Sequence, residues 1–246
     1  PTGYGNSPYS PRSVFAGNEM LISPEMLYMA GLIDRYEAEP PDLPSGRVDY
    51  NEVIRWKSPL LHKAAERALS SRLERRAFEA FKEREAPWLD GYALFMAIHD
   101  IYGDARWHTV WDREIASKDE GALERIRKEK KAEIDIYKAL QYLFDRQIRA
   151  LRSYASSIGI KLIGDVPIYA AADSADTWAD PTLFRKDKVA GVPPDMFCPT
   201  GQLWGNPVYN WKRHEETGFD WWIRRIRRAL DMADTLRMDH FKGFSE

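Results

Sequence analysis

The sequence has little cysteine and no long apolar run. Cys198 is the only cysteine among the 246 residues, which excludes a disulfide within the chain and is typical of a reducing compartment. No apolar run approaches the length of a membrane span, and the N-terminal residues PTGYGNSPYS lack the charged and then apolar order of a secretory signal. We therefore expect a cytoplasmic protein that does not bind a membrane.

The sequence also lacks a strong excess of charge and a recognisable set of metal ligands. Its formal net charge of −2 argues against a nucleic acid or an anionic membrane as a partner held by bulk charge. The five histidines show no spacing with acidic residues or with Cys198 that is typical of a metal site. We expect neither a nucleic-acid partner nor a metal or other cofactor.

Aromatic side chains, in contrast, are abundant. Nine Trp, twelve Tyr and ten Phe make up 13 % of the sequence. Aromatic faces stack on the C–H faces of sugars, but large α/β cores also contain many aromatic residues. Composition alone therefore leaves sugar binding and an aromatic-rich core as alternatives.

Helices are predicted over the middle of the chain. Ser58-Pro59 supplies a cap followed by proline at the first helical position, and residues 60–84 contain neither Gly nor Pro. Residues 91–102 are a shorter candidate, and residues 117–120 have the spacing of a capping box before a long segment that ends at Gly159. We expect one domain over residues 1–246, with a mainly helical insertion at about residues 52–117.

After Gly159 the pattern changes to that of strands. Residues 161–169, KLIGDVPIY, form a short, mostly apolar run of the kind that a buried parallel strand shows. A helix is predicted after Asp220, and residues 235–241, TLRMDHF, form a second strand candidate. Two strands joined by a connection that contains a helix predict a βαβ unit and an α/β fold.

Arg237 and Asp239 stand two residues apart on the second candidate strand, so their side chains point to the same face. Leu236 and Met238 point to the other face, which is typical of a barrel strand that reaches its C-terminal rim. The arginine favours the ionised form of the aspartate, and a glycosyl nucleophile must be ionised when the substrate arrives. The alternative is a structural ion pair at the end of a strand.

Asp165 lies inside the apolar run of the first candidate strand, where an unpaired charge is costly. It therefore needs a partner, which the hydroxyl groups of a sugar or a buried arginine can supply. The simplest alternative is that Asp165 pairs with Arg237 across neighbouring strands.

Residues 189–211, VAGVPPDMFCPTGQLWGNPVYNW, predict a long functional loop with defined turns, because Gly and Pro are frequent in it. Exposed aromatic side chains are costly unless they are used, so four of them are candidates for stacking on a ligand: Phe197, Trp204, Tyr209 and Trp211. About half of these are expected only to pack the loop onto the rest of the domain.

Four ordered segments of the sequence resemble the signature segments of the amylomaltase family of 4-α-glucanotransferases. They are GYGNSPYSPRSVFAGN near the N-terminus, GDVPIYAAADSADTW, the 189–211 segment with its GQLWGNP, and LRMDHFKGF. The resemblance implies a (β/α)8 TIM-type barrel with inserted subdomains, and transfer of α-1,4-glucan segments with retention of configuration. The implied partners are maltooligosaccharides and α-1,4-glucans.

The same resemblance implies roles for individual residues. Asp239 matches the nucleophile of the family, Arg237 the arginine that holds it ionised, and Asp165 the aspartate that contacts the glucosyl unit of the donor. The other matching positions contact the substrate or line its cleft, and they are Ser7, Tyr9, Asp195, Trp204 and His240.

The sequence also departs from the family pattern. A retaining mechanism needs a second carboxylate about 5–5.5 Å from the nucleophile, as general acid and base, and the family carries this glutamate on the strand after that of the nucleophile. Glu246 is too close to Asp239 to lie on that strand, and the first barrel strand is expected to start before residue 1. Residues 184–189 are a shorter connection than in relatives. The resemblance therefore predicts an incomplete barrel and a chain that by itself has no turnover.

Two other functions are compatible with the sequence. One is an α-amylase-type glucan hydrolase, which shares the barrel and the Arg-x-Asp strand, and the other is a non-catalytic glucan-binding module. The long 189–211 segment favours transfer over hydrolysis, because a lid that excludes water lets an acceptor sugar intercept the glycosyl-enzyme. A catalytic glutamate downstream distinguishes the enzyme from the binding module.

Overall fold

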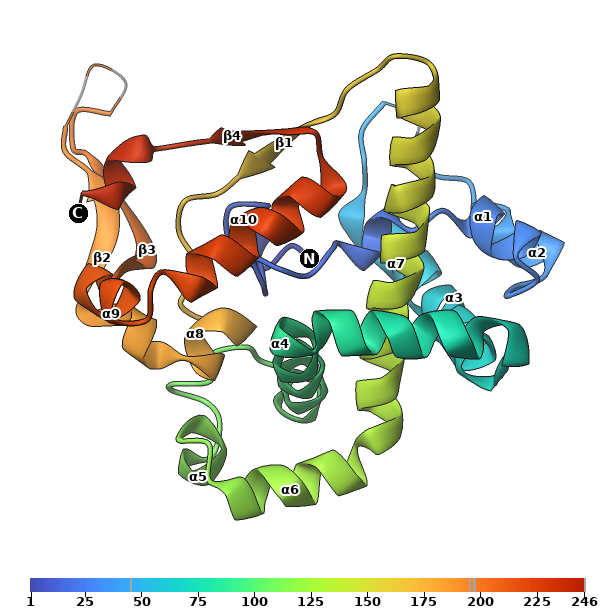
Figure 1. The fold of residues 1–246 in the computed structure, drawn as a ribbon, viewed down its shortest axis with the longest axis horizontal. Coiled ribbons are helices and arrows are strands. Elements are labelled where there is room, and N and C mark those ends of the chain that lie inside the picture. Colours follow the sequence, from blue (N-terminus) through green and yellow to red (C-terminus); the bar gives the residue numbers. More distant parts are fainter. Residues whose placement is uncertain (45, 195, 197, 246) are drawn as a thin grey trace. The chain divides into compact units, whose positions relative to one another are not determined.

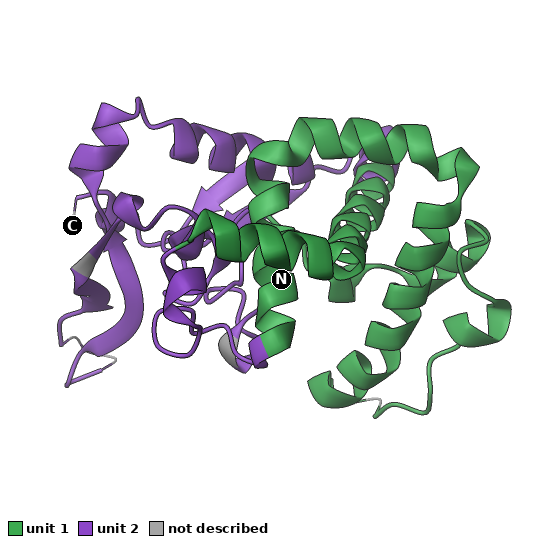
Figure 2. Ribbon diagram, turned by 90° about the horizontal axis from the view of Figure 1, so that it is seen from below, with its two compact units in different colours: residues 1, 16–101, 118–151 green, residues 2–15, 102–117, 152–246 purple. Residues whose placement is uncertain are grey.

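The computed structural model of the chain describes residues 1–44, 46–194, 196 and 198–245. The chain divides into two compact units, one formed by residues 1, 16–101 and 118–151, the other by residues 2–15, 102–117 and 152–246 (Figure 2). The first unit is helical, and the second contains the strands that the structure describes. This arrangement of helices and strands confirms the predicted α/β class.

Three long helices dominate the first unit, namely α3 (Tyr50–Ser70), most of α4 (Arg72–Tyr102) and most of α7 (Lys131–Ser157) (Figure 1). Shorter elements complete it: η2 (Glu19–Leu21), α1 (Pro24–Met29), α2 (Arg35–Ala38) and α6 (Glu120–Glu129). Its core is mostly apolar, and Leu61, Leu89 and Phe95 are buried in it. The insertion expected at residues 52–117 overlaps this unit and stays a prediction.

The predicted start of α3 is wrong. The helix begins at Tyr50, because the side chain of Asp49 accepts hydrogen bonds from the backbone N–H groups of Asn51 and Glu52 and so caps the first turn. Pro59 lies inside the helix, where a proline costs about 3 kcal/mol. Burial of one face of the helix, including Leu61, offsets this cost.

The prediction of separate helices at residues 60–84 and 91–102 is also wrong. Residues 72–102 form the single helix α4, with Pro87 in its interior. Most of the side chains between Leu89 and Ile98 are buried, so packing outweighs the local helix-breaking signals. The long segment predicted after residue 117 consists instead of α6, which Asp119 caps, and α7, which ends just before Gly159.

The predicted βαβ unit is present in the second unit. Strands β1 (Ile163–Val166) and β4 (Thr235–Met238) are parallel, and α10 (Asp220–Met232) precedes β4. Strand β1 stops before Pro167, which has no N–H to donate to a strand ladder. Shorter helical elements of the unit are η1 (Tyr4–Asn6), α5 (Arg113–Ala116), α8 (Ala175–Ala179), η3 (Pro181–Leu183), α9 (Trp211–Glu216) and η4 (Phe241–Phe244).

The long loop predicted at residues 189–211 is in large part a β-hairpin. Strands β2 (Phe184–Val192) and β3 (Gln202–Tyr209) pair antiparallel, with irregular register between Phe184 and Gly191. A Cβ at Gly191 would collide with the backbone oxygen of Gln202, so the absence of a side chain lets the two strands approach. The glycine that indicated a loop therefore serves the pairing of the strands.

Aromatic side chains form much of the core of the second unit. The Tyr209 ring lies 5.0 Å from that of Trp222 and 5.7 Å from that of Trp221, measured between centroids, and all three side chains are buried. His214 packs against Tyr209 in the same cluster. The aromatic content of the sequence is therefore explained in part by this core. None of the described helices is long and apolar enough to cross a membrane.

Candidate active site

The parallel pairing of β1 and β4 brings three charged side chains together. Asp165 and Arg237 are direct partners in the strand register. Arg237 Nη1 lies 3.1 Å from both carboxylate oxygens of Asp165, and its Nη2 lies 2.9 Å from Oδ1 of Asp239. One guanidinium thus bridges two carboxylates, an arrangement that its planar set of donors suits.

Tyr9 joins this cluster from the N-terminal segment. Its hydroxyl group donates a hydrogen bond of 2.7 Å to Oδ2 of Asp165. This hydrogen bond raises the pKa of the Tyr9 phenol above its ordinary value, with burial as a smaller cause. The phenol oxygen of Tyr9 and the carboxylates of Asp165 and Asp239 raise the pKa of Arg237, so the guanidinium stays charged.

Asp239 comes directly after β4, where the chain turns. The next residue, His240, has a positive φ of 47°, a left-handed conformation that is uncommon outside glycine and typical of tight turns and functional sites. The turn aims the His240 backbone N–H at Oδ1 of Asp239, at 3.0 Å. Both described hydrogen bonds of this carboxylate reach Oδ1, and its side chain is 46 % exposed, which leaves Oδ2 available to a ligand.

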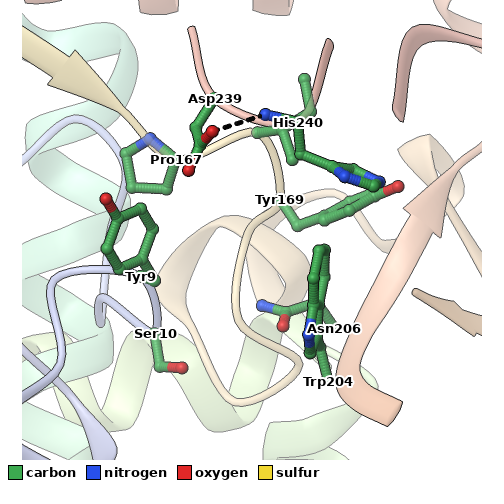
Figure 3. Close-up of a pocket in the computed structure, with 9 residues that line it drawn as sticks. Tyr9, Ser10, Pro167, Tyr169, Trp204, Asn206, Asp239 and His240 are labelled. Atoms are coloured by element: carbon green, nitrogen blue, oxygen red, sulfur yellow. Dashed lines mark hydrogen bonds between the residues drawn. The ribbon is translucent and has the colours of Figure 1, made fainter. Parts of the chain in front are cut away.

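A cavity of about 350 Å³ lies beside Asp239. Figure 3 shows Tyr9 and Pro167 on one side of it and Tyr169 and Trp204 on the other. Its remaining lining residues are Ser10, Ile168, Asn206 and His240. The volume is within the range of about 300–1,000 Å³ that is usual for small-molecule sites. Aromatic rings around a carboxylate suit a sugar, which offers both C–H faces and hydroxyl groups.

Three rings form one wall of the cavity. The centroids of Trp204 and His240 are 4.8 Å apart, at an interplanar angle of 75°, and Tyr169 lies 6.0 Å from His240 and 6.4 Å from Trp204. Trp204 is 38 % exposed as a residue, although its indole N–H donates to the side chain of Gln202. Part of the indole face is thus available to a ligand.

Of the residues proposed from the sequence, the structure places six at this cavity or at the charged cluster beside it. They are Tyr9, Asp165, Trp204, Arg237, Asp239 and His240. Ser7 does not line the cavity, and its hydroxyl group accepts a hydrogen bond of 3.2 Å from the backbone of Tyr9. Asp195 and Phe197 lie outside the described residues.

Sequence reasoning missed several residues that line the cavity. Tyr169 and Asn206 contribute side chains to it, and Tyr209 and Trp211, which were candidates for stacking, do not line it. Tyr209 is buried in the aromatic core. The one feature of the sequence that could have indicated Tyr169 as a cavity residue was its position at the end of the apolar strand candidate. Among the described residues, no cluster of three or more His, Cys, Asp or Glu side chains forms a metal site.

Comparison with known proteins gives the family. The model of the 4-alpha-glucanotransferase family matches residues 1–246. A 4-alpha-glucanotransferase from Thermus thermophilus is 44 % identical over 252 residues, and one from Aquifex aeolicus is 44 % identical over 246 residues. These alignments cover 99 % and 98 % of this chain, but 50 % and 49 % of the two relatives. The chain thus spans about half the length of these relatives.

Solved structures agree with this result. Amylomaltase from Streptococcus agalactiae, in a complex with acarbose, matches with a TM-score of 0.92 at 39 % identity, over 99 % of this chain and 51 % of that chain. Amylomaltase from Corynebacterium glutamicum matches with a TM-score of 0.76 at 23 % identity, over 96 % and 33 % of the two chains, which shows a shared fold alone. The fold is therefore an α/β fold shared with amylomaltases. The chain belongs to the 4-alpha-glucanotransferase family, as its four signature segments predict.

Proposed function

We propose that this chain carries the nucleophile and part of the donor site of a 4-α-glucanotransferase that transfers α-1,4-glucan segments with retention of configuration. The observation that supports this most is the bridge from Arg237 to Asp165 and Asp239, next to a cavity with aromatic walls. The names of the relatives support the choice of reaction. The donors are maltooligosaccharides and α-1,4-glucans, and the acceptor is glucose or a maltooligosaccharide.

In the proposed first step, Oδ2 of Asp239 attacks the anomeric carbon of the donor. The bond between this carbon and the glycosidic oxygen breaks, and the leaving oxygen takes a proton from a general acid, for which we assign no residue of this chain. The product is a glycosyl ester of Asp239. In the second step the 4-hydroxyl group of an acceptor sugar attacks the same carbon and gives its proton to the conjugate base of that acid. Two inversions at the anomeric carbon give net retention.

The neighbouring residues hold the donor and the nucleophile in place. Arg237 and the backbone N–H of His240 fix the carboxylate of Asp239 through Oδ1. Asp165, which Tyr9 and Arg237 orient, accepts hydrogen bonds from hydroxyl groups of the donor sugar. Trp204 stacks on a sugar ring, because part of its face is exposed at the cavity. His240 lines the same cavity and contacts the substrate there. Ser7 and Asp195 are assigned to substrate contact by the family resemblance alone, because Ser7 does not line the cavity and Asp195 lies outside the described residues.

We also propose an architecture and a location for the protein. The β1–α10–β4 arrangement is part of a (β/α)8 barrel, because parallel strands with an intervening helix and charged residues at the carboxyl ends of the strands are typical of that fold. Residues 52–117 form a helical insertion within the barrel domain. The protein acts in the cytoplasm, a choice that the single cysteine supports.

The decisive test is Asp239→Asn in the full-length gene product. The amide is nearly isosteric with the carboxylate but forms no glycosyl ester, so the rate of maltotriose disproportionation, followed as glucose release, is expected to fall by at least about 10³-fold. Asp187→Asn is the matched control. Asp187 also pairs with an arginine two residues before it, Arg185, at 2.6 Å, but it lies on β2 and does not line the cavity.

The rate of Asp239→Asn decides whether Asp239 is the nucleophile. If Asp239→Asn keeps more than a tenth of the wild-type rate, Asp239 is not the nucleophile. A third variant, Asp239→Ala, is treated with azide and α-maltosyl fluoride. Azide is expected to take the vacated place of the carboxylate, displace fluoride and give the β-glycosyl azide. A glucan hydrolase, the alternative, would release reducing sugar without lengthened products, so chromatography of the maltotriose products distinguishes the two reactions.

A further inference from the structure

The segment that follows β1 forms part of the cavity but has no regular secondary structure. This segment, residues 167–170, is called here the cavity-wall segment, and its Pro167, Ile168 and Tyr169 line the cavity. Ile168, Tyr169 and Ala170 are buried. Buried backbone carbonyl groups need hydrogen-bond donors, and a segment outside a strand ladder must obtain them from elsewhere.

Side chains supply these donors. Arg225, on α10, donates through Nη1 to the carbonyl oxygen of Ile168 at 2.9 Å and through Nη2 to the carbonyl oxygen of Pro167. The hydroxyl group of Tyr209 donates to the same Ile168 oxygen at 2.7 Å and accepts from Arg225 Nη1 at 3.0 Å. Asn206 Nδ2 donates to the carbonyl oxygen of Ala170 at 3.1 Å. The carbonyl groups of three of the four residues are held in this way.

Arg225 is itself buried against tryptophan rings. It is 1 % exposed, and its guanidinium carbon lies 4.8 Å from the centroid of the Trp222 ring and 5.5 Å from that of Trp221. A guanidinium is planar and offers several donors in fixed directions, so one group can serve two successive carbonyl oxygens and a hydroxyl group. A lysine is a point charge on a flexible stem and cannot reproduce that geometry.

We propose that Arg225 is a positioning residue for donor binding. It holds the cavity-wall segment, and thereby the Tyr169 ring, at the distance from Trp204 and Asp239 at which a glucosyl unit fits. Arg225 does not touch the substrate, and its described hydrogen bonds do not reach β4, which carries Arg237 and precedes Asp239. This inference rests on the proposed function, because it assigns Arg225 a role in the same site.

The role predicts an uneven effect on the kinetics. Loss of the fixed wall weakens binding of the donor, whereas the nucleophile and its two hydrogen-bond donors stay in place. Arg225→Lys is therefore expected to raise KM for maltotriose at least about tenfold and to lower kcat less than about fivefold. A general loss of folded protein lowers the apparent kcat instead and leaves KM unchanged.

The same helix offers a matched control. Arg228 is 3 % exposed and donates through Nε to the carbonyl oxygen of Phe15 at 3.3 Å, in a segment outside the cavity. Arg228→Lys removes a buried guanidinium of the same kind, so it is expected to lower Tm by a similar amount. Its KM and kcat are expected to change less than about twofold.

Kinetics, melting curves and amide hydrogen exchange are compared for the full-length wild type and both variants. In Arg225→Lys the amides of residues 168–171 are expected to exchange faster than in Arg228→Lys. Equal KM values, or equal exchange at 168–171, in the two variants would overturn the role of Arg225. If the wild type does not transfer glucan, the proposed function fails, and the exchange data alone decide whether Arg225 fixes the segment.

A milder variant covers the case in which Arg225→Lys does not fold. Tyr209→Phe removes only the hydroxyl group between Arg225 and Ile168, and the ring stays in the aromatic core. It is expected to raise KM for maltotriose by about two- to fivefold, in the same direction as Arg225→Lys. An unchanged KM in this variant, with a lowered Tm, would contradict the proposal.

Discussion

Asp176 offers a quantitative test of the buried electrostatics of this protein. The carboxylate lies in α8, is 6 % exposed as a residue, and accepts a hydrogen bond of 2.9 Å from the backbone N–H of Val14. Burial raises its pKa from an ordinary value of 3.8 to about 6, although the Val14 hydrogen bond and the charge of Arg225 act in the opposite direction. The charged form is thus destabilised in the folded protein.

The pKa difference gives both the size and the sign of the effect. The folded state binds this proton more tightly than the unfolded state does, so this carboxyl group favours folding below about pH 4. Its contribution is lost as the pH rises from about 4 through about 6, the pKa of the folded state. At about 1.4 kcal/mol per pH unit, the total loss is on the order of 3 kcal/mol.

Asp176→Asn should remove this dependence. An amide oxygen can still accept from Val14 N, and any penalty for the new buried N–H₂ group does not depend on pH. The free energy of unfolding of Asp176→Asn minus that of the wild type is therefore expected to rise by on the order of 3 kcal/mol between pH 4 and pH 7. This difference isolates the effect of Asp176. Other carboxyl groups, such as Asp234, have lowered pKa values and change the free energy of unfolding of both proteins alike.

Urea unfolding at a series of pH values, followed by tryptophan fluorescence, measures this difference. Asp173→Asn is the matched control, because Asp173 precedes α8 and is only partly buried. It separates the effect of burial from the loss of one negative charge. A difference for Asp176→Asn that stays flat from pH 4 to pH 7, or that falls, would refute the argument from burial.

Two further substitutions test individual contacts at the cavity. Trp204→Ala is expected to weaken maltooligosaccharide binding by about 1–3 kcal/mol, as for other stacked rings; calorimetric titration that shows unchanged affinity in a destabilised variant would mean that the indole only packs. Tyr9→Phe removes the hydrogen bond to Asp165 and is expected to raise KM for maltotriose by less than about tenfold with little change in kcat, because both groups are partly exposed and Arg237 still holds the carboxylate. A loss of kcat in Tyr9→Phe that exceeds the rise in KM would contradict this role.

The parts of the site that depend on strand alternation were predictable from the sequence. The alternation in TLRMDHF put Arg237 on one face with Asp239, and the apolar run around Asp165 predicted its need for a partner. The structure shows that Arg237 serves both carboxylates. The pair with Asp165, which was the simplest alternative, and the contact with Asp239 are therefore compatible, since a guanidinium has two terminal nitrogens.

Other features depend on contacts between distant segments and leave little trace in local sequence. The sequence predicts a loop where the hairpin β2–β3 forms, because Gly191 and the prolines near it give the same signal in a loop as at a close approach of strands. Tyr169 lines the cavity because a side chain on α10, more than fifty residues later, holds the backbone next to it. Pro59 predicts the start of a helix, but it lies inside α3, because burial of one face of the helix outweighs the cost of the proline.

The sharing of one guanidinium between two carboxylates also sets the charge of the site. Arg237 contributes one positive charge against the negative charges of Asp165 and Asp239, so the cluster keeps a formal charge of −1. In the proposed reaction a neutral glucan is not repelled by this charge, and the positive charge that develops on the sugar is stabilised by it. Sugars that carry phosphate or carboxylate groups are repelled at the same place. In the proposed site, the negative formal charge of this cluster therefore favours neutral sugars over anionic ones.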